Sequence, residues 1–251
     1  MRIAALYDIH GNRFALDAVL AELESIRPDV ILIGGDIVAG PFPREVLERL
    51  VSLPNVRIIR GNTEREVLHP GPSVPATWAE RMGWVRDQLN PDQLGFLDRL
   101  PEQMVLNADT LGPTLFVHGS PRSDEEIVTA LTPDARLREM LAQVPQRTMI
   151  GGHTHMQLDR SVDGIRFVNA GSVGMPYEEG RGAYWAMIGP TIEHRRTEYD
   201  LDRAVAAIRA SAFPRAADFV DRYLLGHPSP ADSAAFFEKI SAERAAASPR
   251  A

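Results

Sequence analysis

The sequence of 251 residues contains no cysteine. A disulfide framework and thiolate chemistry are therefore excluded. The sequence also has no apolar run of membrane-spanning length, and the apolar run at its N-terminus ends at Asp8, which makes it too short for a signal peptide or a membrane helix. We therefore expect a cytoplasmic protein without a membrane partner.

An excess of positive charge is also missing, because 27 Lys and Arg face 34 Asp and Glu, for a net charge of -7. Binding to duplex nucleic acid would call for clustered Lys and Arg, so we expect no such partner. A small phosphorylated substrate stays compatible with this charge, because a bound divalent metal reverses the local charge. At 44% hydrophobic residues, the chain has enough apolar side chains for a sizeable core.

Strands and helices alternate in the first sixty residues. Apolar runs at residues 2–7, 29–36 and 55–62 are typical of buried strands, and the segments 12–26 and 43–53 have apolar residues at helical spacing. This alternation predicts an α/β fold with parallel strands. Ligands bind at the carboxyl ends of strands in such sheets, and each of these strands ends in polar residues.

The remaining chain adds strands and a helical end. We expect strands at 114–118 and 147–152, a hairpin through Asp163 and Gly164, and two closing strands within 182–199. Two helices are expected within 77–100, separated at Asn90 and Pro91, and another at 134–144. From Leu201 the chain is Ala-rich and helical, with breaks at Pro214 and within 226–230. We therefore predict a domain of residues 1–200 and a helical extension, 201–251, that packs on it and could mediate oligomer formation.

Seven polar residues follow the predicted strands and form a candidate metal site. They are Asp8, His10, Asp36, Asn62, His118, His153 and His155. Oxygen and imidazole donors of this kind suit Mn, Fe, Zn or Ni better than Ca. Seven ligands are too many for one tetrahedral site, and they fit two metals that share a carboxylate.

Five motifs carry a resemblance to a known family. In order, "DIHGN", "GGD", "RGNTE", "VHGSP" and "GGHTH" resemble the pattern of the calcineurin-like metallophosphoesterases, from Arg2 to about Tyr199. The match is closest to the compact bacterial and archaeal branch of phosphodiesterase type, whose loop N-x-G-S-x-G is similar to "NAGSVG" here. The resemblance implies a four-layer αββα sandwich of two mixed β-sheets flanked by helices.

The resemblance also implies a role for each candidate ligand. Asp8, His10 and His155 would hold one metal, and Asn62, His118 and His153 would hold the other. Asp36 would bridge the two ions, with Mn²⁺ favoured over Fe, Zn, Ni or Mg. A hydroxide between the ions would then attack phosphorus.

Thr63 departs from the family pattern, because many relatives have a histidine there that protonates the leaving oxygen. A threonine hydroxyl is a poor acid near neutral pH, and general acid–base help is typically worth ~10²–10⁴-fold. Members of the compact branch that this chain resembles often have a residue other than His here and are often phosphodiesterases, so the resemblance implies a phosphodiester or an activated phosphate as the substrate. His69, which follows soon after in the chain, is the alternative acid.

Other residues near the motifs have two interpretations each. Asn12 and Arg13 directly follow the first ligands and are candidate substrate contacts, with Asn62, Thr63 and Asp36 as the catalytic residues. Asn12 could instead cap the helix that follows, and Arg13 could be a solvated surface residue. For Glu64 we expect a hydrogen bond that orients a ligand.

Other functions stay open at this stage. A phosphomonoesterase or protein phosphatase and a dinucleoside polyphosphate hydrolase are the enzymatic alternatives. A metal-binding scaffold without catalysis is the alternative from another class. All seven ligand positions hold competent residues, which favours an enzyme over a scaffold.

Overall fold

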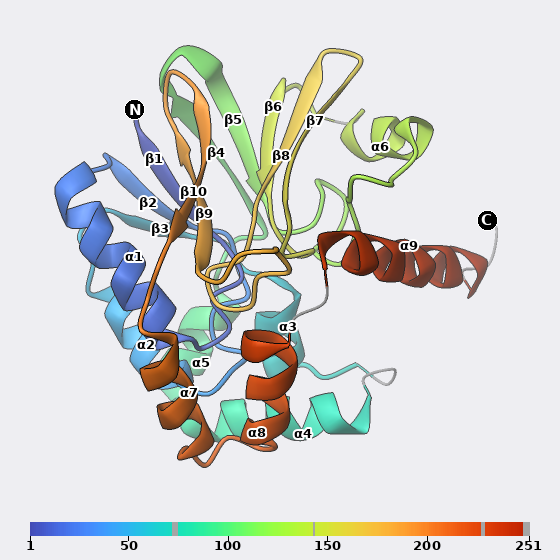
Figure 1. Cartoon of the computed structure of the whole chain (residues 1–251). Coiled ribbons are helices and arrows are strands. Elements are labelled where there is room, and N and C mark those ends of the chain that lie inside the picture. The colour runs from blue at the N-terminus through green and yellow to red at the C-terminus, as the bar shows by residue number, and fades with distance from the viewer. Residues whose placement is uncertain (72–74, 143, 227–228, 248–251) are drawn as a thin grey trace.

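The computed structural model describes residues 1–71, 75–142, 144–226 and 229–247. Two five-stranded sheets stand side by side in it (Figure 1). The strands are β1 (Ile3–Leu6), β2 (Val30–Ile33), β3 (Val56–Ile58), β4 (Gln103–Ala108), β5 (Gly112–Val117), β6 (Thr148–Gly151), β7 (Gln157–Val162), β8 (Ile165–Ala170), β9 (Ala183–Ile188) and β10 (Ile192–Thr197).

The first sheet has the strand order β10-β9-β1-β2-β3. Strands β1, β2 and β3 are parallel, as their alternation with helices predicts. Strand β9 pairs antiparallel with β1 on its other side, and β10 closes the sheet at that edge. The sheet is therefore mixed, and its two halves come from opposite ends of the chain.

The second sheet has the order β4-β5-β6-β8-β7. Strands β5, β6 and β8 are parallel, and β7 pairs antiparallel with β8. The two-residue turn between β7 and β8 is Asp163-Gly164, with φ angles of 49° and 78°. Both residues lie in the left-handed region that such hairpin turns require, so the predicted hairpin is confirmed.

Helices cover the outer faces of the two sheets, and one core lies between them. Tyr7, Phe116 and Val168 belong to the cluster between the sheets. Helices α1 (Arg13–Ile26) and α2 (Pro43–Val51) share a second cluster with the outer face of the first sheet. Helix α6 (Asp134–Leu141) packs on the second sheet. The four-layer αββα sandwich is therefore confirmed.

The remaining helices lie below the sheets in Figure 1, except α9 (Pro230–Ala247), which lies to the right, below α6. The others are α3 (Asn62–Leu68), α4 (Ala76–Gln88), α5 (Pro91–Asp98), α7 (Leu201–Arg209) and α8 (Ala216–Phe219), with a 3₁₀ turn at Asp109–Leu111 and a π-helical turn at Val220–Leu225. Ile208, Phe213 and Phe219 join the same cluster as Met82 and Val85 of α4. The chain beyond residue 200 thus shares the core of the first sheet, and the boundary at residue 200 stays a prediction.

Two elements have no counterpart in the sequence analysis. Strand β4 alternates exposed and partly buried residues at an edge of the second sheet, so its apolar signal is weak. Helix α3 begins at Asn62 directly after a strand motif and is too short to show a periodic pattern. Of the predicted breaks after Leu201, the first lies between α7 and α8, and the second includes residues 227–228, which lie outside the described residues.

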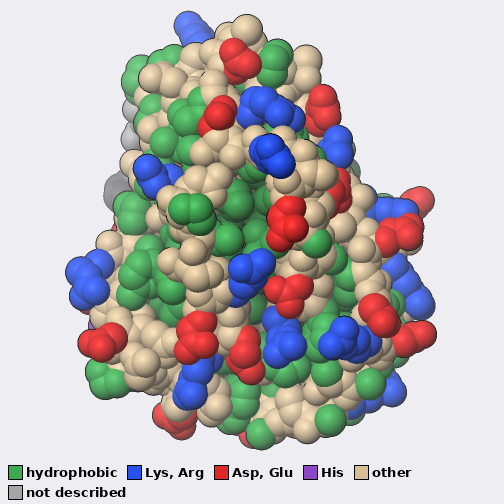
Figure 2. Space-filling view, turned by 90° about the vertical axis from the view of Figure 1, so that its left-hand side faces the viewer, with side chains coloured by type: hydrophobic (Ala, Val, Ile, Leu, Met, Phe, Trp, Pro, Cys, Tyr) green, Lys and Arg blue, Asp and Glu red, His purple; other side chains and the backbone are tan. Residues whose placement is uncertain are grey.

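The surface on the α1 side of the molecule carries mixed charge (Figure 2). Arg and acidic side chains are interspersed there, and no His among the described residues is visible on this face. None of the helices in the described part of the chain has the length and apolar character needed to cross a membrane.

Candidate metal centre

All seven candidate ligands lie just beyond strand ends, where the two sheets meet. Asp8 and His10 follow β1, Asp36 follows β2, and Asn62 follows β3 as the first residue of α3. His118 follows β5, while His153 and His155 follow β6. Both sheets therefore contribute to one site, at the carboxyl edge that the sequence predicts.

Four of the candidates form a compact cluster. The ligand atoms of Asp8, His10, Asp36 and His155 all lie within 4.8 Å of one another, and all four residues are buried. His155 Nε2 lies 3.1 Å from His10 Nε2 and 3.4 Å from Asp8 Oδ1. Two imidazole nitrogens that face each other and a carboxylate oxygen are a donor set for a divalent cation.

Asp36 faces both halves of the site. Its Oδ2 lies 3.6 Å from His10 Nε2, and its Oδ1 lies 3.4 Å from His118 Nε2. The His118 ring in turn contacts the His153 ring edge-on, with centroids 5.3 Å apart. A carboxylate with one oxygen toward each group of histidines has the placement that a shared ligand of two metals needs.

Left-handed backbone is concentrated at the site. Asp8, His10, Asp36, His153 and His155 have φ angles of 53°, 47°, 53°, 67° and 60°. Such conformations cost of order 1–3 kcal/mol each outside glycine, and they persist only where the surroundings fix them. They turn the chain sharply after each strand, so that two side chains spaced by one residue can both face the cluster.

Three predicted ligand atoms are buried without a hydrogen-bond partner among the described residues. They are Asp8 Oδ1, Asn62 Oδ1 and His118 Nε2. An unsatisfied buried polar atom costs about 1–3 kcal/mol, so each needs a partner. The two oxygens are acceptors, and His118 Nε2 offers a lone pair once its proton is displaced. The residues present therefore fit bound cations.

Backbone carbonyls orient the imidazoles. His118 Nδ1 donates to the carbonyl of Gly34 over 2.8 Å, and His155 Nδ1 donates to that of Met175 over 2.7 Å. His10 Nδ1 lies 3.3 Å from the Ala39 carbonyl. A carbonyl can only accept, so each Nδ1 holds the proton and leaves Nε2 for the cluster, which is the arrangement that metal-binding histidines need.

The cluster shifts the pKa values of its members. Burial works to raise the pKa of the Asp8 carboxyl, but the His155 and His118 imidazoles beside it outweigh burial and hold that pKa below its usual value. Burial and the neighbouring His155 lower the pKa of His10 to about 4. Burial opposes the charged form of His118, yet the Asp36 and Asp8 carboxylates raise its pKa to about 10. His10 is therefore neutral near pH 7, whereas a metal at His118 must displace a proton.

Glu64 holds the loop that carries Asp36. Its carboxylate accepts hydrogen bonds from the backbone N–H groups of Asp36 (2.8 Å), Ile37 (2.7 Å), Val38 (3.3 Å) and Gly61 (2.9 Å). Burial, followed by the charge of Asp36, raises the pKa of Glu64. The expectation that Glu64 orients a ligand by hydrogen bonding is therefore confirmed. Its bonds go to backbone N–H groups of the loop that carries Asp36 and not to the Asp36 side chain.

Close approach of the backbone needs glycine at two points. A Cβ on Gly61 would lie 2.2 Å from Asp36 Oδ1, and one on Gly152 would lie 2.6 Å from Asp8 Oδ2. Both distances are far below van der Waals contact. These glycines let the two carboxylates sit directly against the neighbouring loops.

Glu66 and Trp78, which orient the Asn62 side chain, were not found from the sequence. Asn62 Nδ2 donates to Glu66 Oε1 over 3.1 Å, and Trp78 Nε1 donates to the other oxygen of Glu66 over 2.5 Å. This arrangement fixes the Asn62 amide and leaves its Oδ1 without a hydrogen bond among the described residues. The available signal was the spacing of Asn62 and Glu66, which are four residues apart and therefore neighbours on one helix face.

Asn12 and Arg13 lie beside the cluster with contacts of their own. Asn12 is fully buried, its Oδ1 accepts from Ala15 N, and its Nδ2 donates to the carbonyl of Gly174. The capping interpretation is therefore confirmed. The Arg13 guanidinium lies 5.2 Å from the centre of the Phe14 ring and 5.7 Å from that of Phe42. Substrate binding by either residue stays a prediction.

Thr63 and His69 differ sharply in position. Thr63 is buried beside the cluster, its N–H donates to Asp36 Oδ1 over 3.0 Å, and its hydroxyl has no partner among the described residues. His69 lies at the C-terminal end of α3, and its side chain is 74% exposed. Its Nε2 lies 3.6 Å from Asp98 Oδ1. Thr63 is therefore the residue beside the cluster, while His69 is at the surface.

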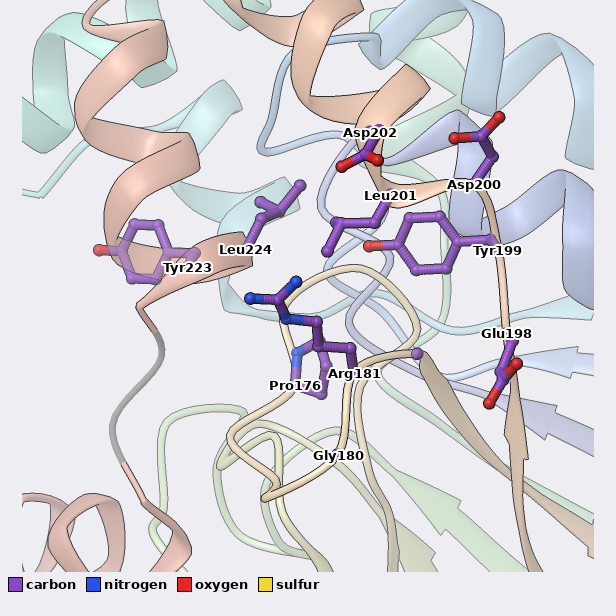
Figure 3. A pocket seen from close by; sticks show the side chains of 11 residues that line it. Pro176, Gly180, Arg181, Glu198, Tyr199, Asp200, Leu201, Asp202, Tyr223 and Leu224 are labelled. Carbon is purple, nitrogen blue, oxygen red and sulfur yellow. The ribbon is translucent and has the colours of Figure 1, made fainter.

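Of two further cavities, only one is lined by a candidate ligand. One of about 400 Å³ lies between residues 176–182 and the start of α7, and in Figure 3 the Arg181 side chain points into it. The other, of about 230 Å³, is lined by His118 together with Arg60, Arg65 and Arg122. Each of these three arginines is paired with an acidic side chain, so their charge is already compensated.

The chain belongs to the calcineurin-like phosphoesterase superfamily, whose domain model matches residues 1–188. An uncharacterized protein of Methanocaldococcus jannaschii is 27% identical over 237 residues, which cover 84% of this chain and 93% of that protein. The crystal structure of a metallophosphoesterase from Sphaerobacter thermophilus is 28% identical, with a TM-score of 0.70, and covers 83% of this chain and 93% of its own.

A structure of a hypothetical protein from Pyrococcus horikoshii has the same fold over more of the chain. It has a TM-score of 0.79 at 21% identity and covers 91% of this chain and 99% of that one. That share exceeds what residues 1–200 alone could supply, so the shared fold includes part of the C-terminal helices. The fold, the family and the buried Asp/His cluster together define a metal-binding member of a hydrolase superfamily.

Replacing Glu64 tests how strongly its carboxylate supports the site. Glu64→Ala removes the acceptor of four backbone N–H groups in a buried place, and we expect a loss of at least about 3 kcal/mol in the free energy of unfolding. Urea unfolding followed by circular dichroism measures it. Glu179→Ala, at an exposed position, should stay within about 0.5 kcal/mol. Equal stability of the two variants would contradict the role of Glu64.

Metal binding should stabilise the folded chain. A ligand bound only by the folded state adds about 2.7 kcal/mol at a hundredfold excess over Kd, which corresponds to about 5–10 °C for a chain of this size. We expect this rise when metal-stripped protein is reloaded with Mn²⁺, measured by scanning calorimetry. Asp36→Asn should lose most of the rise and the exposed-site control His69→Ala none of it. A full rise in Asp36→Asn would argue against this cluster as the metal site.

Proposed function

We propose that the chain is a dinuclear metal-dependent phosphodiesterase. The observation that supports the proposal best is the set of donors around Asp36, whose two oxygens face His10 on one side and His118 on the other. In this proposal Asp8, His10 and His155 hold one ion, Asn62, His118 and His153 hold the other, and Asp36 is shared. Manganese is the metal we favour, because imidazole and carboxylate donors are combined.

When bound, two such ions supply an activated water and neutralise charge on the phosphoryl oxygens. The chain's own residues do the positioning. Carbonyl contacts of the Nδ1 atoms orient the His118 and His155 rings so that Nε2 is the atom left for a metal, and Glu66 holds the Asn62 amide so that Oδ1 is left for the second ion. The catalytic roles proposed for Asp36 and Asn62 rest on this positioning.

Thr63 supports a diester or an activated phosphate as the substrate. Its unpartnered hydroxyl can hydrogen-bond a phosphoryl oxygen, but it cannot supply a proton readily near neutral pH. The carboxylates of Asp8 and Asp36 already take up positive charge in the cluster, because they lie next to imidazoles. A diester has one negative charge fewer than a fully ionised monoester, so it needs less positive charge than the monoester would. A cytoplasmic location and a small phosphorylated substrate are part of the same proposal.

The first test compares two substrates with the same leaving group. Protein stripped of metal and reloaded with Mn²⁺ should hydrolyse bis-p-nitrophenyl phosphate with a higher kcat/KM than p-nitrophenyl phosphate. Asp36→Asn and His153→Ala should lose this activity while remaining folded, and His69→Ala should keep it. Preference for the monoester would instead favour a phosphomonoesterase, and silence on both with two metals bound would favour a scaffold.

The second test restores the missing acid. Thr63→His should raise the hydrolysis of an alkyl monoester such as glycerol 3-phosphate by about tenfold or more, since general acid–base help is typically worth ~10²–10⁴-fold. Thr63→Ser serves as the control, because it keeps a hydroxyl and adds no acid. An unchanged rate in Thr63→His, with the metal content of the wild type, would mean that Thr63 is not the reason for a diester preference.

A further inference from the structure

An aromatic cavity lies beside the metal centre and is built mainly by the C-terminal helices. Its volume is about 270 Å³, and its lining residues are Tyr177, Arg222, Tyr223, Asp232, Ser233, Phe236 and Phe237. Only Tyr177 lies within residues 1–188, which the family model matches. The other residues come from the π-helical turn Val220–Leu225 and from α9, which lies near the loops beyond β7 and β8 in Figure 1.

The cavity walls touch the candidate ligands directly. The Tyr177 ring stacks on the His155 ring, with centroids 5.0 Å apart and planes inclined by 22°. The Phe237 ring lies 6.4 Å from that of His153 and 6.1 Å from that of Tyr177. A group that extends from a phosphate at the cluster would therefore meet these two rings first.

A partly exposed candidate ligand lies beside this cavity. Asp8, Asp36 and His118 are almost completely buried, while His153 is partly exposed, as are Tyr177 and Phe237. Asn62 is the other partly exposed candidate ligand. The aromatic cavity therefore adjoins the cluster through Phe237 and His153 and through Tyr177 and His155.

Polar groups accompany the aromatic rings. Ser233 is 3% exposed, and its hydroxyl has no hydrogen-bond partner among the described residues. Such an orphan hydroxyl costs about 1–3 kcal/mol unless something bonds to it. The Asp232 carboxylate accepts from the Ser229 hydroxyl and has acceptor capacity left, and the Arg222 guanidinium lies 5.4 Å from the centre of the Tyr223 ring. Hydrogen-bonding groups therefore adjoin aromatic faces.

We propose that this cavity binds the nucleobase of a nucleotide whose phosphate lies at the metal centre, an inference that rests on the proposed function of that centre. Aromatic faces suit the flat surface of a base, and Ser233 and Asp232 suit its hydrogen-bonding edge. A purely hydrocarbon group would leave the Ser233 hydroxyl unsatisfied. The volume is slightly below the roughly 300–1,000 Å³ of sites for drug-sized ligands, which fits a single base and not a polymer.

The test separates the base from the phosphate. AMP and ribose 5-phosphate have the same phosphate and sugar, and only AMP has a base. Full-length protein loaded with Mn²⁺ should bind AMP about 5-fold to 100-fold more tightly than ribose 5-phosphate in isothermal titration calorimetry, the range that stacking on aromatic side chains gives. Equal affinities, or no binding of either ligand at millimolar concentration, would overturn the proposal.

Variants locate the effect in the cavity. Phe237→Ala and the milder Ser233→Ala should each reduce the ratio of the two affinities by threefold or more, as an order-of-magnitude expectation, while ribose 5-phosphate binds as in the wild type. Ser241→Ala, on the same helix but outside the cavity lining, should leave the ratio unchanged. Thermal unfolding of each variant checks that it is folded. If Phe237→Ala weakened both ligands equally, the ring would support the metal centre and not the base, which would overturn the proposal.

Failure of the base-binding proposal can be distinguished from failure of the proposed phosphodiesterase function. Tight AMP binding without turnover of any diester would keep the base site and remove the phosphodiesterase. Turnover of bis-p-nitrophenyl phosphate with equal affinity for AMP and ribose 5-phosphate would keep the phosphodiesterase and remove the base site.

Discussion

The burial of two carboxylates, Asp8 and Asp36, is the constraint on which the rest of the structure depends. Two negative charges out of water are strongly unfavourable unless charge and hydrogen bonds compensate them. Imidazoles from both sheets and backbone N–H groups supply part of that compensation, with His153 N donating to Asp8 Oδ2 and Thr63 N to Asp36 Oδ1. Asp8 Oδ1 still has no hydrogen-bond partner among the described residues, as expected of a ligand atom in a metal-binding cluster.

This demand explains where the unusual backbone occurs. Five of the left-handed residues are the candidate ligands Asp8, His10, Asp36, His153 and His155, and Gly61, Gly152 and the buried Glu64 contact the two carboxylates or the loop that carries Asp36. Each of these features would be unfavourable in isolation. They are held in place because both sheets end at the same edge and share one core, in which Tyr7 and Phe116 pack between them. Strain at the site is thus balanced by regular packing behind it.

Much of the site could be predicted because each ligand directly follows a strand. The apolar runs before Asp8, Asp36 and His118 are clear, and parallel strands bring their carboxyl ends together. Strand β4 was missed, since an edge strand with alternate exposed residues has little apolar signal. Glu64 was expected to orient a ligand, but the sequence did not reveal that it would do so through four backbone groups. That detail depends on how two loops approach each other.

The aromatic cavity illustrates what the sequence pattern hides. Tyr177 lies in an irregular loop, and Phe237 lies on a helix that the family match does not include. Neither belongs to a motif, and their contacts with His155 and His153 follow only from the way α9 packs against the loops of the second sheet. Local pattern identifies residues that bind metal, because chemistry restricts their type. It does not identify residues that shape a cavity, because many apolar types can fill that role.

The pairing of β1 with β9 has a consequence for the order of synthesis. Strand β1 leaves the ribosome well before its antiparallel partner, which begins only at Ala183, after the whole second sheet. At roughly 5–20 residues per second, one edge of β1 waits about 10 to 40 s for that partner. During this interval the nascent chain exposes an apolar strand with an open edge, which is a template for wrong pairing. Packing of α1 covers only a face of β1, so the edge that later pairs with β9 stays open until Ala183–Ile188 has been made.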